Sequence, residues 1–281
     1  MKTIESDYDF SEMHQRMQFY IDQNILSCCA TAVFKGTDLV DHQTFGYMDL
    51  ETRQPLRDDG IYRMASNTKI VTSVALMMLQ EAGLFDLDDP LAKFMPEFSD
   101  MQVLQPNASA AADVSPAENL ISVRHLLSHS AGLSYGFVEP DSVIDQAYLN
   151  NGVNGLGEQE IDLEELCLRI AKLPLAFEPG TSWRYSFATD VCARLVEVLS
   201  GLSFDVFLRQ RLFEPLGMVD TDFWVPEEKA HRLITMYSPQ DLFDPMKPGL
   251  NEAGDVITGP YKAKPTMLSG GGGLVSTVAD Y

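Results

Sequence analysis

The sequence predicts a globular fold that contains both strands and helices, because strand and helix patterns occupy different parts of its 281 residues. Strand patterns gather near the N-terminus and are expected again after Asp220, whereas helical patterns fill the middle of the chain. A chain of this length is expected to form one large domain or two intertwined ones. Its content of 45% hydrophobic and 22% charged residues is typical of a globular protein and excludes a disordered or low-complexity chain.

The N-terminal part predicts one helix and then a hairpin. Apolar residues recur at helical spacing between about residues 6 and 24, at Phe10, Met13, Met17 and Ile21. Residues 28–34 and 39–48 have strand patterns, and the turn between them contains Gly36. We therefore expect an amphipathic helix followed by two antiparallel strands.

Residues 66–82 predict a long helix that ends at Gly83. This helix is apolar almost all round, since it contains Ile70, Val71, Val74, Ala75, Leu76, Met77, Met78 and Leu79. A helix without a polar face is typical of a protein interior. We therefore expect it to be buried in the middle of the fold.

Three further helices, separated by loops, are predicted in the middle of the chain. They are expected at residues 122–129, 162–173 and 189–199. Ser122 and either Thr189 or Asp190 are the expected N-caps, and Gly201 ends the last helix. Segments rich in small and polar residues predict a surface loop at 107–118 and a connector at 150–160.

The chain is strongly acidic, with 41 Asp and Glu against 20 Lys and Arg residues and a formal net charge of -21. This charge repels phosphate backbones and anionic lipids, so neither a nucleic-acid nor a membrane partner is expected. No apolar run is long enough to span a bilayer, and the acidic N-terminus does not resemble a secretory signal. The cysteines, which are Cys28, Cys29, Cys167 and Cys192, have no metal-ligand spacing. We expect a reduced, cytoplasmic chain.

The segment Ser66-Asn67-Thr68-Lys69 places a serine and a lysine on one face of the predicted helix. At a helix N-terminus, free N–H groups and the helix dipole stabilise developing negative charge. A nucleophile, a nearby base and such a backbone are what acyl transfer requires. A lysine becomes a base near neutral pH only if burial or a cation lowers the amine pKa by about 3 units, and the apolar helix supplies burial. The alternative is a serine N-cap followed by a surface lysine.

Tyr185 follows a Pro-Gly turn and an aromatic segment, just before the helix predicted at 189–199. Such a junction holds a phenol rigidly, and a tyrosine beside a cation can relay protons. The alternative is a core aromatic side chain whose hydroxyl is satisfied by a hydrogen bond.

Two patterns predict chemistry that their surroundings do not support. Gly132-Leu133-Ser134-Tyr135-Gly136 matches the nucleophile elbow of α/β-hydrolases, which requires a sharp strand-to-helix turn. A helical pattern precedes Ser134 here and Pro140 follows it, so a structural turn is the better interpretation. His125 and His129 have the spacing of a zinc helix, but the glutamate of the motif and a third ligand are missing. Packing or hydrogen bonding is expected of both histidines.

The glycine run at 270–273 does not precede the Lys-Ser/Thr pair of a phosphate-binding loop. A flexible turn or a close approach of the backbone to the site is expected instead. We therefore expect neither a metal nor a cofactor.

The order and spacing of these motifs resemble the serine β-lactamase and penicillin-binding-protein family over almost the whole chain. The most similar branch is that of class C β-lactamase-like esterases, the family VIII carboxylesterases, with related acyltransferases. The matching segments are Ser66-Asn67-Thr68-Lys69, GLFDLDDP at 83–90, VRHLLSHSAGLS at 123–134, Glu178-Pro179-Gly180, Tyr185-Ser186, LGMVDT at 216–221 and GGGGLVST at 270–277.

The resemblance implies a β-lactamase-like α/β fold, in which an antiparallel sheet flanked by helices adjoins a mostly helical region. Residues 1–66 are expected to form the N-terminal helix and first strands of the α/β domain, and residues 67–200 the mostly helical region. Residues 201–281 are expected to return to the α/β domain. The site is expected where the two parts join.

The resemblance also implies roles for three residues. Ser66 is the acylated nucleophile, and Lys69 with Tyr185 forms the base that activates first the serine and then the deacylating water. From their proximity to the motifs, the side chains expected to line the substrate pocket are Tyr135, Phe137, Trp183 and Phe187.

The family's third motif, Lys-Thr-Gly or a His/Trp-x-Gly variant, has no match after Tyr185. Leu268-Ser269-Gly270 is the nearest segment. In relatives this motif lies on a late strand that lines the site. The remaining strands and a terminal helix follow in those relatives, and one of those strands supplies the second oxyanion N–H. We therefore expect that a C-terminal segment of the α/β domain is missing from this sequence or is supplied by another chain.

The sequence thus favours a serine carboxylesterase that cleaves small acyl esters without a cofactor. β-Lactam hydrolysis ranks lower, because relatives hold the substrate carboxylate with the cation of the third motif and the field of this chain is negative. Acyl transfer by the same residues is a further hypothesis, and a non-catalytic binding protein on the same fold is the last. The sequence does not predict an oligomeric state.

Overall fold

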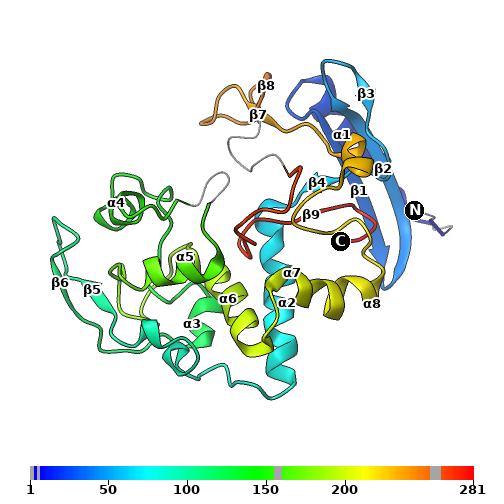
Figure 1. Ribbon diagram of the computed structural model, residues 1–281. Coiled ribbons are helices and arrows are strands. Elements are labelled where there is room, and N and C mark those ends of the chain that lie inside the picture. The colour runs from blue at the N-terminus through cyan, green and yellow to red at the C-terminus, as the bar shows by residue number, and fades with distance from the viewer. Residues whose placement is uncertain (1–2, 5–6, 155–159, 254–260) are drawn as a thin grey trace. The chain divides into compact units, whose positions relative to one another are not determined.

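The computed structural model describes residues 3–4, 7–154, 160–253 and 261–281 (Figure 1). The chain forms two compact units, and each combines segments that are distant in sequence. The sheet unit is Met1–Arg63, Met218–Ala263 and Val275–Tyr281, and the helical unit is Met64–Gly217 and Lys264–Leu274. The domain boundaries predicted after residues 66 and 200 stay predictions.

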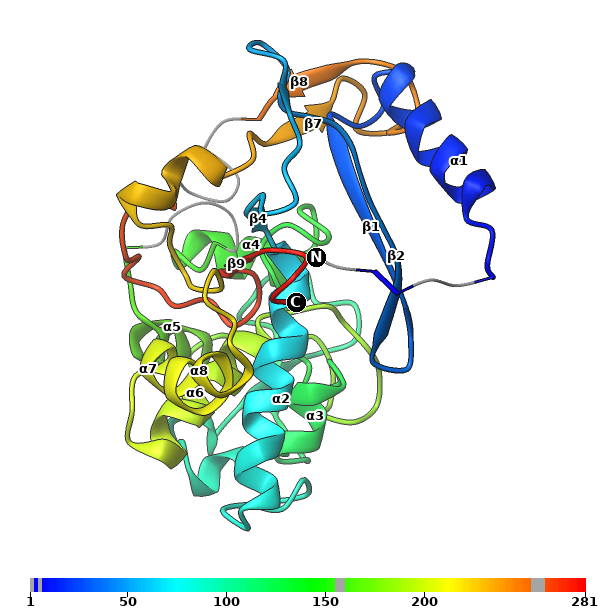
Figure 2. The same cartoon turned by 90° about the vertical axis from the view of Figure 1, so that its right-hand side faces the viewer.

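The sheet unit begins with the predicted helix and hairpin. Its first elements are α1 (Ser11–Asp22), β1 (Cys28–Lys35), β2 (Asp38–Asp49) and β3 (Gln54–Pro55). β1 and β2 are antiparallel, Lys35 pairs with Asp38, and the turn between them uses Gly36 at a φ of 64°. α1 lies beside β2, where the His14 imidazole contacts the Asp41 carboxylate at 2.9 Å (Figure 2). The hairpin is confirmed, and the helix begins at Ser11 rather than near residue 6.

Short strands complete the sheet unit after Asp220, as predicted. β7 (Tyr237–Pro239) pairs with β8 (Leu250–Glu252), and β4 (Tyr62–Arg63) pairs with β9 (Val275–Ser276). Both pairs are antiparallel. The 3-10 helix η5 (Glu227–Arg232) precedes β7 in the chain.

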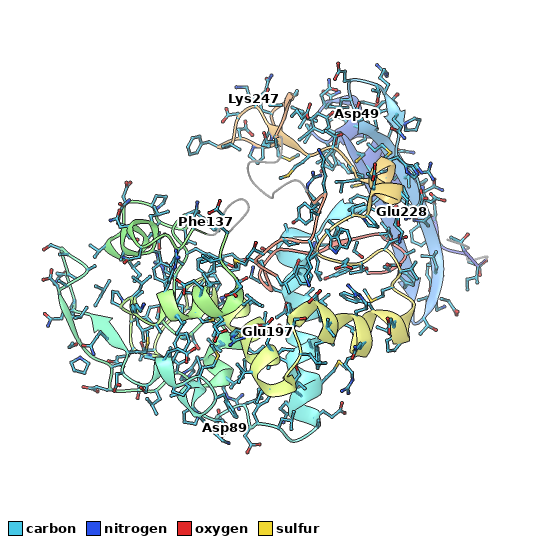
Figure 3. The ribbon with its side chains drawn as sticks, in the orientation of Figure 1. Asp49, Asp89, Phe137, Glu197, Glu228 and Lys247 are labelled. Carbon is cyan, nitrogen blue, oxygen red and sulfur yellow. The ribbon has the colours of Figure 1, made fainter. Side chains whose placement is uncertain are left out.

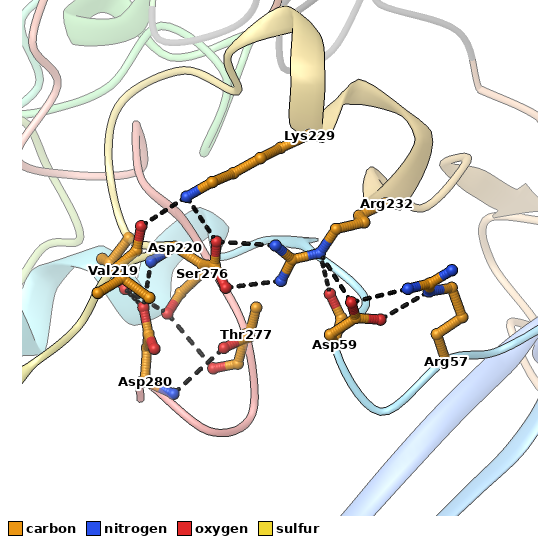
Figure 4. A network of polar contacts seen from close by, with 10 residues as sticks. Arg57, Asp59, Val219, Asp220, Lys229, Arg232, Ser276, Thr277 and Asp280 are labelled. Atoms are coloured by element: carbon orange, nitrogen blue, oxygen red, sulfur yellow. Dashed lines mark hydrogen bonds and ion pairs between the residues drawn. The ribbon is translucent and has the colours of Figure 1, made fainter.

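A polar network links three segments within the sheet unit (Figure 4). The Asp220 carboxylate accepts from both nitrogens of the Arg232 fork, at 2.9 and 2.6 Å, and pairs with Lys229 at 2.8 Å. Arg232 also pairs with Asp59, and the backbone N–H of Asp220 donates to the Asp280 carboxylate at 2.7 Å. Because the forked geometry is specific, this network fixes how the segments meet.

The helical unit is built around α6. Its helices are α2 (Thr68–Glu81), α3 (Val123–Leu127), α4 (Val143–Asn150), α5 (Leu163–Ile170), α6 (Ala188–Ser200), α7 (Phe204–Leu208), the π-helix η4 (Arg209–Phe213), α8 (Glu214–Leu216) and the 3-10 helices η1 (Ala65–Asn67), η2 (Leu91–Lys93) and η3 (Pro96–Phe98). α6 packs against α2, α3, α5 and α7, and most of its side chains are buried. Within the described ranges, no helix has the length and apolar character needed to cross a bilayer.

The predicted helix ends are partly confirmed. Ser122 caps α3 in a capping box with His125, Asp162 caps α5, and Gly201 ends α6 at a φ of 70°. The predicted N-cap of α6 is wrong. The helix begins at Ala188 without a side-chain cap, and the Asp190 carboxylate lies inside the first turn with other partners.

Two further expectations need correction. The loop predicted at 107–118 contains the short strand β6 (Val114–Pro116), which pairs with β5 (Gln102–Leu104). The helix expected to be buried all round leaves Ile70, Val74 and Met77 exposed at 58%, 42% and 37%. They line an open groove of about 730 Å³, because only the opposite face of α2 packs against α6. Part of the connector predicted at 150–160, residues 155–159, lies outside the described residues.

Candidate active site

Ser66 lies on a tight turn that leads into α2. The turn is η1, and α2 starts directly after it at Thr68, two residues later than predicted. Ala65 has a φ of 43°, a left-handed conformation that costs a residue with a Cβ about 1–2 kcal/mol. Ser66 itself is exposed. The strained turn therefore presents the serine hydroxyl in front of the first turn of the helix.

The side chains of Ser66, Lys69 and Tyr185 meet at this turn, all within the helical unit. The hydroxyl oxygens of Ser66 and Tyr185 lie 2.6 Å apart, and the Lys69 amine donates to Ser66 Oγ over 3.2 Å. Lys69 Nζ also lies 4.6 Å from the centre of the Tyr185 ring. A nucleophile within reach of two proton-carrying groups is the arrangement that nucleophilic catalysis requires.

Backbone contacts between two loops hold Tyr185. The N–H of Arg184 donates to the His129 carbonyl at 2.9 Å, and the N–H of Gly180 donates to the Ser130 carbonyl at 2.8 Å. Gly180 has a φ of 85°, which a side chain rarely adopts. The Pro-Gly turn thus brings its loop along residues 129–130 and aims the phenol at Ser66.

The Lys69 amine has a second acceptor, the Gly271 carbonyl oxygen, at 2.6 Å. The Thr72 hydroxyl donates to the neighbouring Gly270 carbonyl at 2.8 Å. A Cβ on Gly270 would come within 2.6 Å of the Ala193 Cβ, so this backbone passes too close to α6 for any side chain. The close approach expected of the glycine run is confirmed.

His129 packs against Tyr185, with ring centres 5.0 Å apart, and its Nδ1 lies 3.2 Å from Ser186 Oγ. Burial, together with the positive charge of Lys69, lowers the pKa of His129 to about 4. The imidazole is therefore neutral near pH 7 and adds no second cation beside Lys69.

The four side chains expected to line the pocket differ in exposure. Tyr135 and Phe187 are buried, with ring centres 4.4 Å apart. Phe137, labelled in Figure 3, is 37% exposed and stacks on Tyr135, while Trp183 is 65% exposed and stacks beside Tyr185. An incoming molecule can touch Phe137 and Trp183, whereas Tyr135 and Phe187 support the site from inside.

Ser134, the serine of the Gly-x-Ser-x-Gly pattern, is fully buried. Its hydroxyl donates to the Asp145 carboxylate and accepts from Arg184 Nε at 2.6 Å. Arg184 also pairs with Asp145 at 3.0 Å, and the N–H of Ser134 donates to the Tyr148 hydroxyl at 3.1 Å. This interior network matches the structural turn that the sequence favours.

His125 is used in a helix cap. Its Nδ1 accepts from the Ser122 N–H at 3.2 Å, and its own N–H donates to Ser122 Oγ at 3.3 Å. Among the residues that the structure describes, no group of three or more His, Cys, Asp or Glu side chains could hold a metal ion.

Sequence reasoning missed Asp190 as part of the site. Its side chain is buried, and its Oδ1 accepts from Ser269 Oγ at 2.7 Å and from the Gly271 N–H at 3.0 Å. These partners are 79 and 81 residues away in the chain, so no local pattern connects them. The available signal was an acidic residue among the apolar positions of the predicted helix, which suggests a buried partner rather than a cap.

The family model described as Beta-lactamase matches residues 15–281, and the chain therefore belongs to the β-lactamase family. This finding confirms the family resemblance and the β-lactamase-like fold.

The chain is also similar to individual proteins and to solved structures. Protein Rv1367c of Mycobacterium tuberculosis is 32% identical over 260 residues, which cover 92% of this chain and 61% of the relative. Esterase EstB of Burkholderia gladioli is 31% identical over 220 residues, which cover 76% of this chain and 53% of the esterase. The solved structure of EstCE1, a hydrolase with promiscuous acyltransferase activity, matches with a TM-score of 0.78 at 25% identity and covers 95% of this chain and 68% of its own. The chain thus spans between half and two thirds of the length of Rv1367c and of EstB.

Proposed function

We propose that this chain carries the catalytic centre of a serine carboxylesterase that cleaves small acyl esters. The observation that carries the proposal is the exposed Ser66 hydroxyl, 2.6 Å from the Tyr185 hydroxyl and 3.2 Å from the Lys69 amine. The name of EstB, an esterase, supports esters as the substrate class, and the description of EstCE1 as a hydrolase supports hydrolysis as the reaction.

In the acylation step, Ser66 Oγ attacks the ester carbonyl carbon while its proton passes to the Tyr185 oxygen, with the Lys69 amine as the second proton carrier. Tyr185 can accept this proton as a phenolate, because its own proton has first passed to the Lys69 amine, and the resulting Lys69 ammonium stabilises the phenolate charge until the Ser66 proton arrives. Collapse of the tetrahedral intermediate breaks the bond to the alcohol oxygen. The alcohol leaves with the proton, and the acyl group remains on Ser66.

In the deacylation step, water takes the place of the alcohol. Tyr185 and Lys69 accept a proton from the water as its oxygen attacks the acyl carbon, and the proton returns to Ser66 Oγ as the acid leaves. The N–H groups at the start of α2 stabilise the negative oxygen of both intermediates. The cycle needs neither a metal nor a cofactor.

Acyl transfer to an alcohol is the second candidate, supported by the promiscuous acyltransferase activity in the description of EstCE1. The two reactions share the acylated Ser66 and differ only in which hydroxyl attacks it. Exposed Phe137 and Trp183 offer aromatic faces to an apolar acyl or alcohol group near this serine.

The experiment measures p-nitrophenol release from acetyl, butyryl and octanoyl p-nitrophenyl esters, with and without a primary alcohol. Hydrolysis in water supports the esterase, and a new ester that forms with the alcohol supports the transferase. Nitrocefin tests β-lactam cleavage in parallel. Release no faster than with the Ser66→Ala variant would contradict the proposal and favour a non-catalytic binding protein.

We also propose that the protein works in the cytoplasm on small molecules. The acidic net charge of -21 and the four cysteines, which are all free thiols, support this location. Fractionation of expressing cells with an antibody to the protein tests it, and recovery outside the cytoplasmic fraction would contradict it.

A further inference from the structure

Asp190 is a buried acidic residue whose contacts lead to the candidate base. It lies in the first turn of α6 and is 1% exposed. Its Oδ1 accepts two hydrogen bonds from the segment around the glycine run, one from the Ser269 hydroxyl and one from the Gly271 N–H. The carbonyl of the same Gly271 accepts from Lys69 Nζ at 2.6 Å. Gly271 thus connects the two side chains: its N–H contacts the Asp190 carboxylate, and its carbonyl oxygen contacts the Lys69 amine.

The backbone at Gly271 is in direct contact with this carboxylate. A Cβ on Gly271 would lie 2.5 Å from Asp190 Oδ2 and 2.9 Å from the Tyr135 hydroxyl. The Leu274 N–H donates to Thr68 Oγ1 at 3.1 Å, which ties the other end of the glycine run to the start of α2. The run is therefore held between α6 and α2 with no space for Gly271 to move toward Asp190.

Burying a carboxylate lowers the stability of the fold unless the group is hydrogen-bonded and lies near a cation. Burial raises the pKa of Asp190, while the hydrogen bonds from Ser269 and Gly271 and the charge of Lys69 act in the opposite direction. Among the residues that the structure describes, the other titratable groups around Lys69 and Asp190 are the Tyr135 and Tyr185 hydroxyls, the neutral His129 ring, and the Cys167 and Cys192 thiols, whose pKa burial raises. Lys69 is thus the cation that Asp190 faces.

We propose that Asp190 is a positioning residue for catalysis: it holds Gly271 so that the Gly271 carbonyl keeps the Lys69 amine beside Ser66. The proposal rests on the proposed function, since it assigns to Asp190 an effect on the base of that reaction. Asp190 acts through Gly271 and Lys69 and does not touch the substrate. Ser269 shares the task because it donates the second hydrogen bond to the same carboxylate oxygen.

The test follows the rate at which a fluorophosphonate modifies Ser66 as a function of pH, in the unaltered chain and in variants. Asp190→Asn keeps the shape of the side chain and an accepting oxygen but removes the charge. Asp190→Ala removes the support altogether. The matched control is Asp205→Asn, because Asp205 is a buried carboxylate that pairs with Lys264 at 2.5 Å and anchors the far end of the same segment.

We expect Asp190→Ala to slow the modification of Ser66 about 100-fold, the loss typical of a reacting group displaced by about 1 Å. Asp190→Asn slows it less, because the amide oxygen can still accept hydrogen bonds, and its rate profile differs from that of the unaltered chain because the carboxylate charge that faces Lys69 is gone. Asp205→Asn melts at a lower temperature but keeps the rate and its pH profile. If Asp190→Ala does not fold, the pH profile of Asp190→Asn decides whether Asp190 positions Lys69.

An unchanged rate and pH profile in folded Asp190→Asn would overturn the proposal, as would equal effects of Asp190→Asn and Asp205→Asn. Failure of the proposed function has a different signature. In that case the unaltered chain does not react with the fluorophosphonate at Ser66 at all, whatever residue occupies position 190.

Discussion

Ser66 and Ser134 are two serines with charged neighbours in the same unit, and their surroundings differ. Ser66 is exposed on a strained turn, with an amine and a phenol at its hydroxyl. Ser134 is fully buried, and its hydroxyl lies between the Asp145 carboxylate and the Arg184 guanidinium. A substrate can reach the first serine and not the second.

The neighbours also differ in whether they can exchange protons. The guanidinium of Arg184 stays charged at all accessible pH values, so its bond to Ser134 is purely structural. The Lys69 amine and the Tyr185 phenol can both give and take a proton. Exposure and proton exchange, rather than the presence of a motif, therefore distinguish the candidate nucleophile from the structural serine.

Ser66→Ala is expected to have the largest effect on activity. Without the hydroxyl the proposed acyl-enzyme cannot form, so ester turnover should fall at least ~1,000-fold, as when known serine hydrolases lose their nucleophile. Because Ser66 is exposed, the melting temperature should hardly change. p-Nitrophenyl acetate hydrolysis and calorimetry check both, and retained turnover would remove Ser66 from the mechanism.

Tyr185→Phe tests whether proton transfer distinguishes Ser66 from Ser134. The variant keeps the ring that packs on His129 but loses the hydroxyl 2.6 Å from Ser66. kcat should fall about 100- to 10,000-fold, the usual contribution of a general base, while KM changes little. A rise in KM at constant kcat would instead make Tyr185 a binding residue.

Ser134→Ala should show the opposite pattern to Ser66→Ala. Removing the hydroxyl leaves the Arg184 and Asp145 groups with an unmade hydrogen bond in the interior, which costs about 1–3 kcal/mol of unfolding free energy. Esterase activity of the folded variant should persist. Urea unfolding measures the cost against Ser128→Ala, an exposed serine control, and equal stability of the two variants would contradict the network.

The smallest effect concerns His129, which lies between the two serines in sequence. Its pKa is about 4 in the folded chain, against about 6.5 for a free histidine. Between these values the unfolded chain binds more protons than the folded one, so the unfolding free energy rises with pH from 4 to 6.5 and falls on acidification.

The His129→Gln variant should lose this part of the pH dependence. Urea unfolding between pH 4.5 and 7 measures it, and the difference should be about 1 kcal/mol after allowance for the partial exposure of the ring. Parallel curves for the two chains would show that His129 titrates alike when folded and unfolded.

Local signals predicted most of the fold. Periodic apolar residues and end signals placed α1, α3, α5 and α6, and Gly36 marked the turn of the hairpin. Helices α4 and α7 were not predicted, although the Ser142 side chain caps α4. The burial of α2 was predicted wrongly because it depends on tertiary contacts. Apolar residues all round α2 could not show that Ile70, Val74 and Met77 would remain exposed, because burial depends on which neighbours cover each face.

The site residues also fall into those that local sequence signals predict and those that depend on tertiary contacts. Lys69 is three residues after Ser66, across the junction of η1 and α2, so local geometry brings the two together. Tyr185 is 119 residues from Ser66 and was found through its turn and the family resemblance. Asp190 had neither signal, because its partners Ser269 and Gly271 become neighbours only when the glycine run packs between α2 and α6.

Intact mass spectrometry of the chain after reaction with a fluorophosphonate, followed by peptide mapping, tests the central claim most directly. The account predicts one adduct per chain, located on Ser66, and no adduct in the Lys69→Ala variant. An adduct on Ser134, or none in the unaltered chain, would contradict it.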